Sequence, residues 1–203
     1  MLRKIIFILV ICLGVAHPIK AQKEFKMNTH TSLEPTASEV CALSVARMEE
    51  KYEIKNHVLE TIASVETGVF DNETGTFISW PWSINVNGKG YRYASKEEAV
   101  EAVKKFQAQG ITSIDVGCMQ ISLKFHGKSF KSVEDAMNPD TNVEYSAQFL
   151  KKLYRKKGNW QKAAMAYHSK VPEHAEIYKK KLLNRFNKMK VAFLDYQPNI
   201  SLF

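Results

Sequence analysis

Glu66 is the side chain whose setting first suggests catalysis. Leu59, Ile62 and Ala63 precede it at helical spacing, so that all four side chains share one face of a predicted helix. An acid on an apolar face is costly unless it is paired or protonated, and burial of a carboxyl group raises its pKa. A carboxyl group that keeps its proton near neutral pH can act as a general acid. A structural carboxylate that caps the helix end or forms a salt bridge is the alternative interpretation.

Two further segments complete a pattern with this acid. They are Gly117-Cys118-Met119-Gln120-Ile121 and Ala164-Met165-Ala166-Tyr167-His168. Together with Val65-Glu66-Thr67-Gly68, and in chain order, they resemble the three motifs of the lytic transglycosylase domain, which is related to goose-type lysozyme. The family motifs read Glu-Ser-Gly, Gly-Leu-Met-Gln-Ile and Ala-Tyr-Asn. The resemblance extends over roughly residues 38 to 182.

The resemblance implies a reaction with one catalytic carboxyl group, Glu66. This acid would protonate the leaving glycosidic oxygen and then take the proton of the muramic acid 6-hydroxyl, while the N-acetyl group of the substrate supplies the second function that glycosidases normally take from another carboxylate. The product would be a 1,6-anhydro-muramyl end, formed without addition of water. The implied substrate-binding residues are Thr67, Met119, Gln120, Tyr167 and His168, and no metal or organic cofactor is implied.

Three departures from the family motifs fall on this pattern. Thr67 stands in place of Ser and keeps a hydroxyl group, whereas Cys118 stands in place of an aliphatic residue. His168 stands in place of the Asn that follows Tyr167, which changes the expected contacts with the sugar. Met119 and Tyr167 each have an alternative interpretation as ordinary core residues.

Cysteine usage points to an oxidising compartment. Removal of an N-terminal signal would leave two cysteines, Cys41 and Cys118, and an even pair in an exported protein is a candidate disulfide. Two small buried thiols are the alternative. The chain also resembles a subgroup of short secreted transglycosylases with a Gly-Cys-Met-Gln motif and a cysteine in the first helix, and this resemblance implies a Cys41–Cys118 bond. The sequence has no CxxC or HExxH motif, which argues against a zinc site.

The elements that must position these residues are mostly helical. Capping-box spacing predicts helix starts at Thr36 and Ser95, and Asn56 and Gly68 are the expected caps of the helix that carries Glu66. Further helices are predicted at 138–158, at 160–167 and from 172 onward, with a compact turn region at 111–122. The expected fold is mainly α, a lysozyme-like α+β domain with a small β-hairpin at the cleft.

The hairpin is predicted around Asn87-Gly88. Residues 77–86 are rich in β-forming residues, and an Asn-Gly pair is a strong signal for a two-residue turn. Aromatic side chains on both arms offer either a wall for stacking of sugar rings or simple packing in a small β-layer. These are Trp80, Trp82, Tyr91 and Tyr93.

The N-terminal residues read as an export signal. Arg3-Lys4 precede an apolar run of 12 residues that ends at Ala16, which is too short to span a membrane. Cleavage is expected after Ala16 or after Ala21, and an uncleaved anchor helix is the alternative. Removal of residues 1–21 takes away three cations and lowers the formal charge from +8 to +5, which suits an anionic partner. The predicted organisation is a signal at 1–21, a polar stretch at 22–37, one catalytic domain at 38–195 and a tail at 196–203.

Three functions are compatible with these features. The leading one is a periplasmic or secreted lytic transglycosylase that cleaves the MurNAc–GlcNAc bond of peptidoglycan glycan strands. A hydrolytic muramidase is the second, and it would need Asp71, Glu73 or Asp115 to activate water. The third is a non-catalytic wall-binding or secretion-assembly protein, with a cell-envelope secretion apparatus as the alternative partner. Nucleic acid is not an expected partner because the charge is diffuse, and no membrane contact is expected after signal cleavage. With 45% hydrophobic residues the chain is not of the disordered class.

Overall fold

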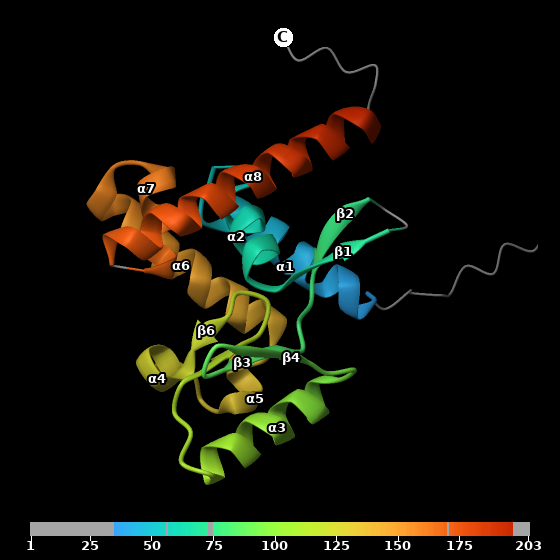
Figure 1. Ribbon diagram of the computed structural model, residues 1–203, viewed down its shortest axis with the longest axis vertical. Coiled ribbons are helices and arrows are strands. Elements are labelled where there is room, and N and C mark those ends of the chain that lie inside the picture. Colours follow the sequence, from blue (N-terminus) through green and yellow to red (C-terminus); the bar gives the residue numbers. More distant parts are fainter. Residues whose placement is uncertain (1–34, 56, 73–74, 170, 197–203) are drawn as a thin grey trace, which may run out of the picture. The chain divides into compact units, whose positions relative to one another are not determined.

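The computed structural model describes residues 35–55, 57–72, 75–169 and 171–196 (Figure 1). The predicted signal at 1–21, most of the predicted polar stretch and the predicted tail beyond Tyr196 lie outside the described residues. Within them, helices dominate and the strands form two small antiparallel sheets. The mainly α, α+β fold predicted for a single lysozyme-like domain is therefore confirmed. In the described part of the chain, no helix is both long enough and apolar enough to cross a membrane.

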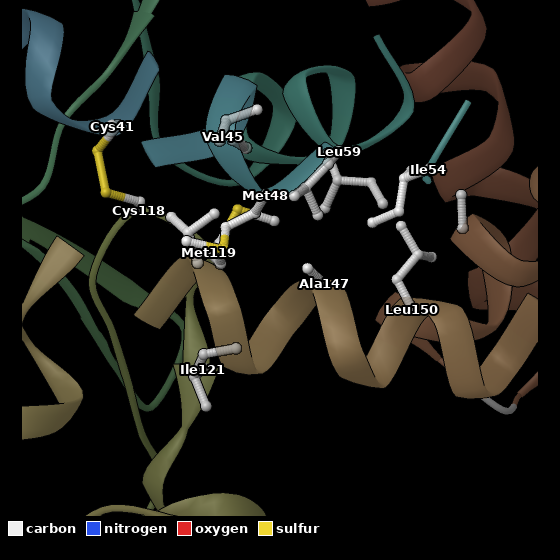
Figure 2. Close-up of a cluster of buried hydrophobic side chains, with 14 of the residues drawn as sticks. Cys41, Val45, Met48, Ile54, Leu59, Cys118, Met119, Ile121, Ala147 and Leu150 are labelled. Carbon is white, nitrogen blue, oxygen red and sulfur yellow. A yellow bond between two sulfur atoms is a disulfide. The ribbon is translucent and has the colours of Figure 1, made fainter. Parts of the chain in front are cut away.

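Five helices enclose the first of two hydrophobic cores. They are α1 (Ala37–Lys51), α2 (Val58–Thr67), α6 (Pro139–Lys157), α7 (Trp160–His168) and α8 (Pro172–Tyr196). Helix α2 contacts α1, α7 and α8, and α6 packs against α1 and α7. The buried side chains of this core include Leu59 and Ile62 of α2 and the Cys41–Cys118 disulfide. Figure 2 shows the disulfide at one edge of the cluster, with Met119 beside it. Helix α2 is thus held inside the core along its length.

The start of α2 differs from the prediction. The helix begins at Val58 after His57, which has a φ of 67°, and Asn56 lies outside the described residues. The side chain of Glu49 in α1 serves as the cap, because its two oxygens accept hydrogen bonds from the backbone N–H groups of His57, Leu59 and Glu60 at 2.7–3.2 Å. The backbone N–H groups at the helix start are therefore bonded by a carboxylate of another helix, where the sequence had predicted a cap by a local Asn.

The end of α2 falls at Gly68, as predicted. Gly68 is the C-cap and continues directly into strand β1 (Gly68–Asp71). A Cβ atom at this position would overlap the Ser64 carbonyl oxygen, so the close approach of backbone, rather than a positive φ, requires glycine here. Arg185 of α8 donates hydrogen bonds to the carbonyl and hydroxyl oxygens of Ser64, and its guanidinium lies 3.4 Å from the ring centre of Phe77. A cation from α8 thereby stabilises the C-terminal end of the helix that carries Glu66.

The β-rich segment at 77–86 is divided between two sheets. Strand β2 (Thr76–Ser79) pairs with β1, while β3 (Ser83–Val86) pairs with β4 (Lys89–Arg92). Pro81 lies between β2 and β3, where its missing N–H ends the strand. The predicted hairpin turn is confirmed, since Asn87 and Gly88 both have positive φ, as a two-residue type I′ turn requires.

The predicted turn region at 111–122 contains two more strands. Strands β5 (Ile114–Val116) and β6 (Ile121–Ser122) extend the sheet in the antiparallel order β4-β3-β5-β6. One face of this sheet forms the second core with helices α3 (Lys96–Ala108) and α5 (Val133–Ala136), through buried side chains such as Ile84 and Val116. Because strand side chains alternate, the polar residues between these positions lie on the opposite face, toward Glu66.

Candidate active site

Glu66 lies in the last turn of α2 and lines two cavities. Its side chain is 14% exposed, which is enough for a substrate to reach it. The Tyr178 hydroxyl of α8 donates a hydrogen bond to Glu66 Oε1 over 2.7 Å, and His168 Nδ1 of α7 lies 3.5 Å from the same oxygen. Both described contacts thus involve Oε1. The predicted acid is therefore partly buried and oriented by two neighbouring side chains.

His168 and Tyr178 form one unit beside the acid. Their rings stack with 4.2 Å between centroids and an angle of 2° between planes. Burial raises the pKa of the Tyr178 phenol well above its usual range, and the nearby Glu66 carboxylate raises it further, so the hydroxyl remains a donor. Sequence reasoning missed Tyr178, because it follows Glu66 by 112 residues and belongs to none of the three motifs.

Two cavities flank Glu66 and share it as a lining residue. One has a volume of about 270 Å³ and lies along β3 and β4, and the other has about 410 Å³ and lies between β5, β6, α6 and α7. Glu66, Asn85 and Gln120 line both cavities. The arrangement is a cleft with the acid at its middle, so that a chain-like substrate could extend to both sides.

Asp115 of β5 is the second carboxylate of the cleft. It lines the larger cavity together with Glu66 and His168. Burial raises its pKa, a hydrogen bond with Ser122 opposes that shift, and the nearby charge of Glu66 adds to it. Of the other two acids considered from the sequence, Asp71 lies on β1 and lines neither cavity, and Glu73 lies outside the described residues.

A tight turn presents Gln120 to the cleft. Gly117 has a φ of 78°, and a Cβ atom there would lie 2.5 Å from Asn142 Nδ2, so glycine is required on both counts. The fully buried Asn142 side chain donates to the carbonyl oxygens of Val116 and Ala136 and accepts from the backbone N–H of Met119, at 2.9–3.0 Å. Gln120 itself has a φ of 46°, and its Nε2 donates to the carbonyls of Ser83 and Gly117. The sequence indicated that Asn138-Pro139 leads to Asn142, but it did not predict this network.

Thr67 connects the helix of the acid to this turn. It is 3% exposed, and its single hydroxyl hydrogen is shared between the carbonyl oxygens of Ala63 and Cys118. Cys118 is in turn linked to α1 through the disulfide. Thr67 lines the smaller cavity. These contacts favour a role for Thr67 in aligning the end of α2 with the turn, rather than a role in extensive contact with a substrate.

The structure separates the roles expected for Met119 and Tyr167. Met119 is fully buried in the first core and lines neither cavity, because the turn directs its side chain inward between α1 and α6. Its carbonyl oxygen lies 3.0 Å from the Tyr167 hydroxyl, which shares its single hydrogen between this oxygen and Ser146 Oγ. Tyr167 lines the larger cavity, and burial raises the pKa of its phenol. Gln120, Tyr167 and His168 thus meet at the cleft, whereas Met119 contributes core packing.

The hairpin aromatics form only part of the expected wall. Tyr91 lines the smaller cavity, but Trp82 and Tyr93 pack against the second core, and Trp80 donates its Nε1 hydrogen to the Tyr93 carbonyl. The aromatic wall is instead on the other side, lining the larger cavity. It consists of Phe125, His126, Tyr145, Phe149 and Tyr167. Sequence reasoning missed it because its members come from α4 (Leu123–His126), α6 and α7.

No metal-binding set accompanies these side chains. Among the residues that the structure describes, no group of three or more His, Cys, Asp or Glu residues is placed to hold a metal ion. The titratable side chains at the cleft include Glu66, Asp115, His168 and Tyr167, with the Tyr178 phenol bonded to Glu66.

Comparison with protein families agrees with this geometry. The model of the family described as "Transglycosylase SLT domain" matches residues 44–181. This segment is more than half of the 203-residue chain and includes all three motifs. Neither the curated proteins nor the solved structures compared with the chain gave a match. The matched segment extends from α1 to α8 and thus contains Glu66, the turn at Gln120 and the Tyr167-His168 pair. The chain therefore belongs to the transglycosylase SLT domain family.

Proposed function

We propose that the protein is an exported lytic transglycosylase that cleaves the MurNAc–GlcNAc bond of peptidoglycan glycan strands, with Glu66 as its single acid and base. The observation that carries the proposal is the position of Glu66 between two cavities, partly buried and oriented through Oε1. With Tyr178 and His168 both at Oε1, we assign Oε2 to the scissile glycosidic oxygen. The family membership supports the reaction class.

In the proposed reaction, Glu66 first protonates the leaving oxygen as the C1–O bond breaks. The carbonyl oxygen of the substrate N-acetyl group attacks C1 from the opposite face and stabilises the positive charge. The carboxylate of Glu66 then accepts the proton of the muramic acid 6-hydroxyl, whose oxygen attacks C1 to close the 1,6-anhydro ring and release the acetamido oxygen. The acid ends the cycle protonated, and no water is consumed.

The remaining groups support these steps by position. Tyr178 donates to Oε1 throughout, which fixes the carboxyl plane, and His168 packs on Tyr178 and faces the larger cavity. Gln120 and Tyr167 are proposed to contact the sugar, and Thr67 to hold the helix end. The disulfide fits an oxidising compartment outside the cytoplasm, in agreement with the proposed export.

Asp115 favours a second candidate, a muramidase that adds water. It is the described acid that shares a cavity with Glu66, and a second carboxylate there could activate a water molecule for attack on C1. In that reaction the products would carry reducing ends. Asp115 would then be essential, whereas the transglycosylase mechanism does not require it.

The mass of the released fragments decides between these mechanisms. Purified protein is incubated with peptidoglycan beside Glu66→Gln, with Glu60→Gln as a matched control, since Glu60 is on the same helix but lines neither cavity. We expect anhydro-muramyl products, one water lighter than hydrolysis products, from the wild type and Glu60→Gln and none from Glu66→Gln. Reducing ends that disappear in Asp115→Asn would establish the muramidase. Absence of release by folded wild-type protein would refute both and leave a wall-binding or secretion-assembly role.

A further inference from the structure

Gly90 and Arg92 of β4 line the smaller cavity. Arg92 brings a cationic side chain to this cavity, and the larger cavity has no Lys or Arg among its described lining residues. In the register of the hairpin Ser83 faces Arg92 and Asn85 faces Gly90, so these four residues share one face of the sheet. All four line the smaller cavity beside Glu66. Arg92 and Gly90 belong to none of the motifs, and the proposed reaction gives neither a role.

Arg92 is the only Lys or Arg among the described residues that line the two cavities at Glu66. Its side chain is exposed, and no described residue forms a salt bridge or side-chain hydrogen bond with its guanidinium. The larger cavity instead carries Asp115. A guanidinium presents its N–H groups in a planar fork that matches a carboxylate, which makes Arg92 a receptor for an anionic group of the ligand.

Arg92 and Asp115 lie on different strands of the same sheet. Arg92 is on β4 and Asp115 on β5, with β3 between them, which places the strands about 10 Å apart. The smaller cavity therefore carries a cation and the larger cavity a second carboxylate, and Glu66 lines both cavities. A ligand whose units alternate between acidic and neutral would bind in one register and be disfavoured in the other.

Gly90 supplies the space for such a unit. Glycine inside a strand weakens the strand and often marks the close approach of a ligand. Gly90 does not have a positive φ, and a Cβ atom there would meet no protein atom within 4 Å. Neither backbone conformation nor internal packing therefore requires glycine at this position. Its lack of a side chain keeps the smaller cavity open next to Arg92.

We propose that Gly90 and Arg92 form the subsite for the carboxylate-bearing sugar of the strand, with Arg92 binding the carboxylate and Gly90 admitting the ring. This inference rests on the proposed function, because it assumes a glycan of alternating N-acetylated sugars in which one bears a 3-O-lactyl group. The carboxylate is that of the lactyl group in a peptide-free strand, or one of the stem peptide where the lactyl group is amidated. The subsite sets the register in which the glycosidic bond reaches Glu66.

Binding to the Glu66→Gln protein tests the subsite without turnover. Calorimetric titration compares a peptide-free tetrasaccharide of alternating GlcNAc and MurNAc with a neutral tetrasaccharide of GlcNAc alone. We expect the acidic ligand to bind about fivefold more tightly, equivalent to about 1 kcal/mol, as for a solvent-accessible ion pair. Arg92→Gln in the same background should abolish this preference, and Lys128→Gln, which removes an exposed cation outside both cavities, should retain it.

A second variant tests the space at the subsite. Gly90→Val should weaken binding of both ligands by more than tenfold, while thermal stability stays the same or rises because valine is favoured in strands. A peptide-bearing fragment identifies the source of the carboxylate: preference for it alone assigns the stem peptide, and preference for the peptide-free ligand assigns the lactyl group. Binding of the peptide-free and the peptide-bearing acidic ligands no tighter than that of the neutral ligand by the Glu66→Gln protein, or a preference that survives Arg92→Gln, would overturn the inference.

Turnover distinguishes this inference from the proposed function. If wild-type protein cleaves peptidoglycan but Arg92→Gln has an unchanged KM and preference, the subsite is wrong and the function stands. If the acidic preference depends on Arg92 but no cleavage occurs, the subsite stands and the enzymatic function is wrong.

Discussion

Replacement of Asn142 by alanine gives the clearest test of how the turn at Gly117–Gln120 is held. The side chain is fully buried and forms three hydrogen bonds with backbone groups, two at the turn, with Val116 and Met119, and one with the carbonyl of Ala136. Alanine would remove the side-chain partner of two buried carbonyl groups and one buried N–H. Because one of these groups belongs to Met119, the change also loosens the residue next to Gln120.

The expected loss follows from the unpaired groups. Each buried backbone group left without a partner costs about 1–3 kcal/mol, and entry of a water molecule into the vacated space would recover part of this. We therefore expect Asn142→Ala to lower the free energy of unfolding by about 3 kcal/mol or more. In a domain of this size that corresponds to a fall in Tm of roughly 10 °C.

Urea unfolding followed by tryptophan fluorescence, under non-reducing conditions, measures the change. Asn159→Ala is the matched control, since that Asn caps α7 through one hydrogen bond to the N–H of Lys162 and should cost about 1 kcal/mol. An equal m-value for both variants would show that the midpoints report stability. If Asn142→Ala costs no more than Asn159→Ala, the turn is held by other contacts and the reasoning is refuted.

Three further predictions concern the acid, the disulfide and the second carboxylate. Tyr178→Phe should lower the rate of muropeptide release at least tenfold with the fold unchanged, because a hydrogen bond to a charged group such as Glu66 contributes about 1.5–3 kcal/mol; unchanged release would contradict the role of the hydroxyl. The double variant Cys41→Ala/Cys118→Ala should lose about 4 kcal/mol in urea unfolding, as expected for closure of a loop of 77 residues, and a loss below about 1 kcal/mol would contradict this. Burial raises the pKa of Asp115, so the folded state binds its proton more tightly than the unfolded state. This carboxyl group therefore favours folding below the ordinary aspartate pKa of 3.8, and the contribution is lost as pH rises through the folded-state pKa. Asp115→Asn should remove that part of the pH dependence of Tm above pH ~4, and an identical profile in both proteins would show that the carboxyl is not desolvated.

Local signals in the sequence predicted most of the elements. The capping box at Thr36 and the Asn138 cap both appear in the structure as hydrogen-bonded starts, and Asn87-Gly88 forms the predicted turn. These features depend on residues within a few positions of one another, so single-sequence reasoning can identify them. Glu66 at the end of α2 belongs to the same class, because helical spacing alone placed it on an apolar face.

Features that depend on distant pairing were not predictable in the same way. The Glu49 cap of α2 replaced a local cap, and the Tyr178 hydroxyl reached Glu66 from another helix. Residues 114–116 were expected in a turn region, since a three-residue strand has no period long enough to detect, yet their pairing with β3 turns Asp115 toward the cleft. Met119 was expected beside the substrate because the resemblance of its motif to the family implied that role. In the structure its side chain is buried in the core, because Gln120 has a positive φ and Asn142 accepts a hydrogen bond from the Met119 N–H.

The Cys41–Cys118 bond closes a covalent ring around part of the active site. Glu66, Arg92 and Asp115 are all within the ring. One proteolytic cut at an exposed cation such as Arg92 would leave both pieces joined through sulfur, so the catalytic acid would stay attached to its helix and turn. Tyr178 lies on the open C-terminal segment, which has no such link. A cut between α6 and α7 would leave the side chains that orient the acid bound by packing alone, and nicked protein would lose this orientation before it lost the acid.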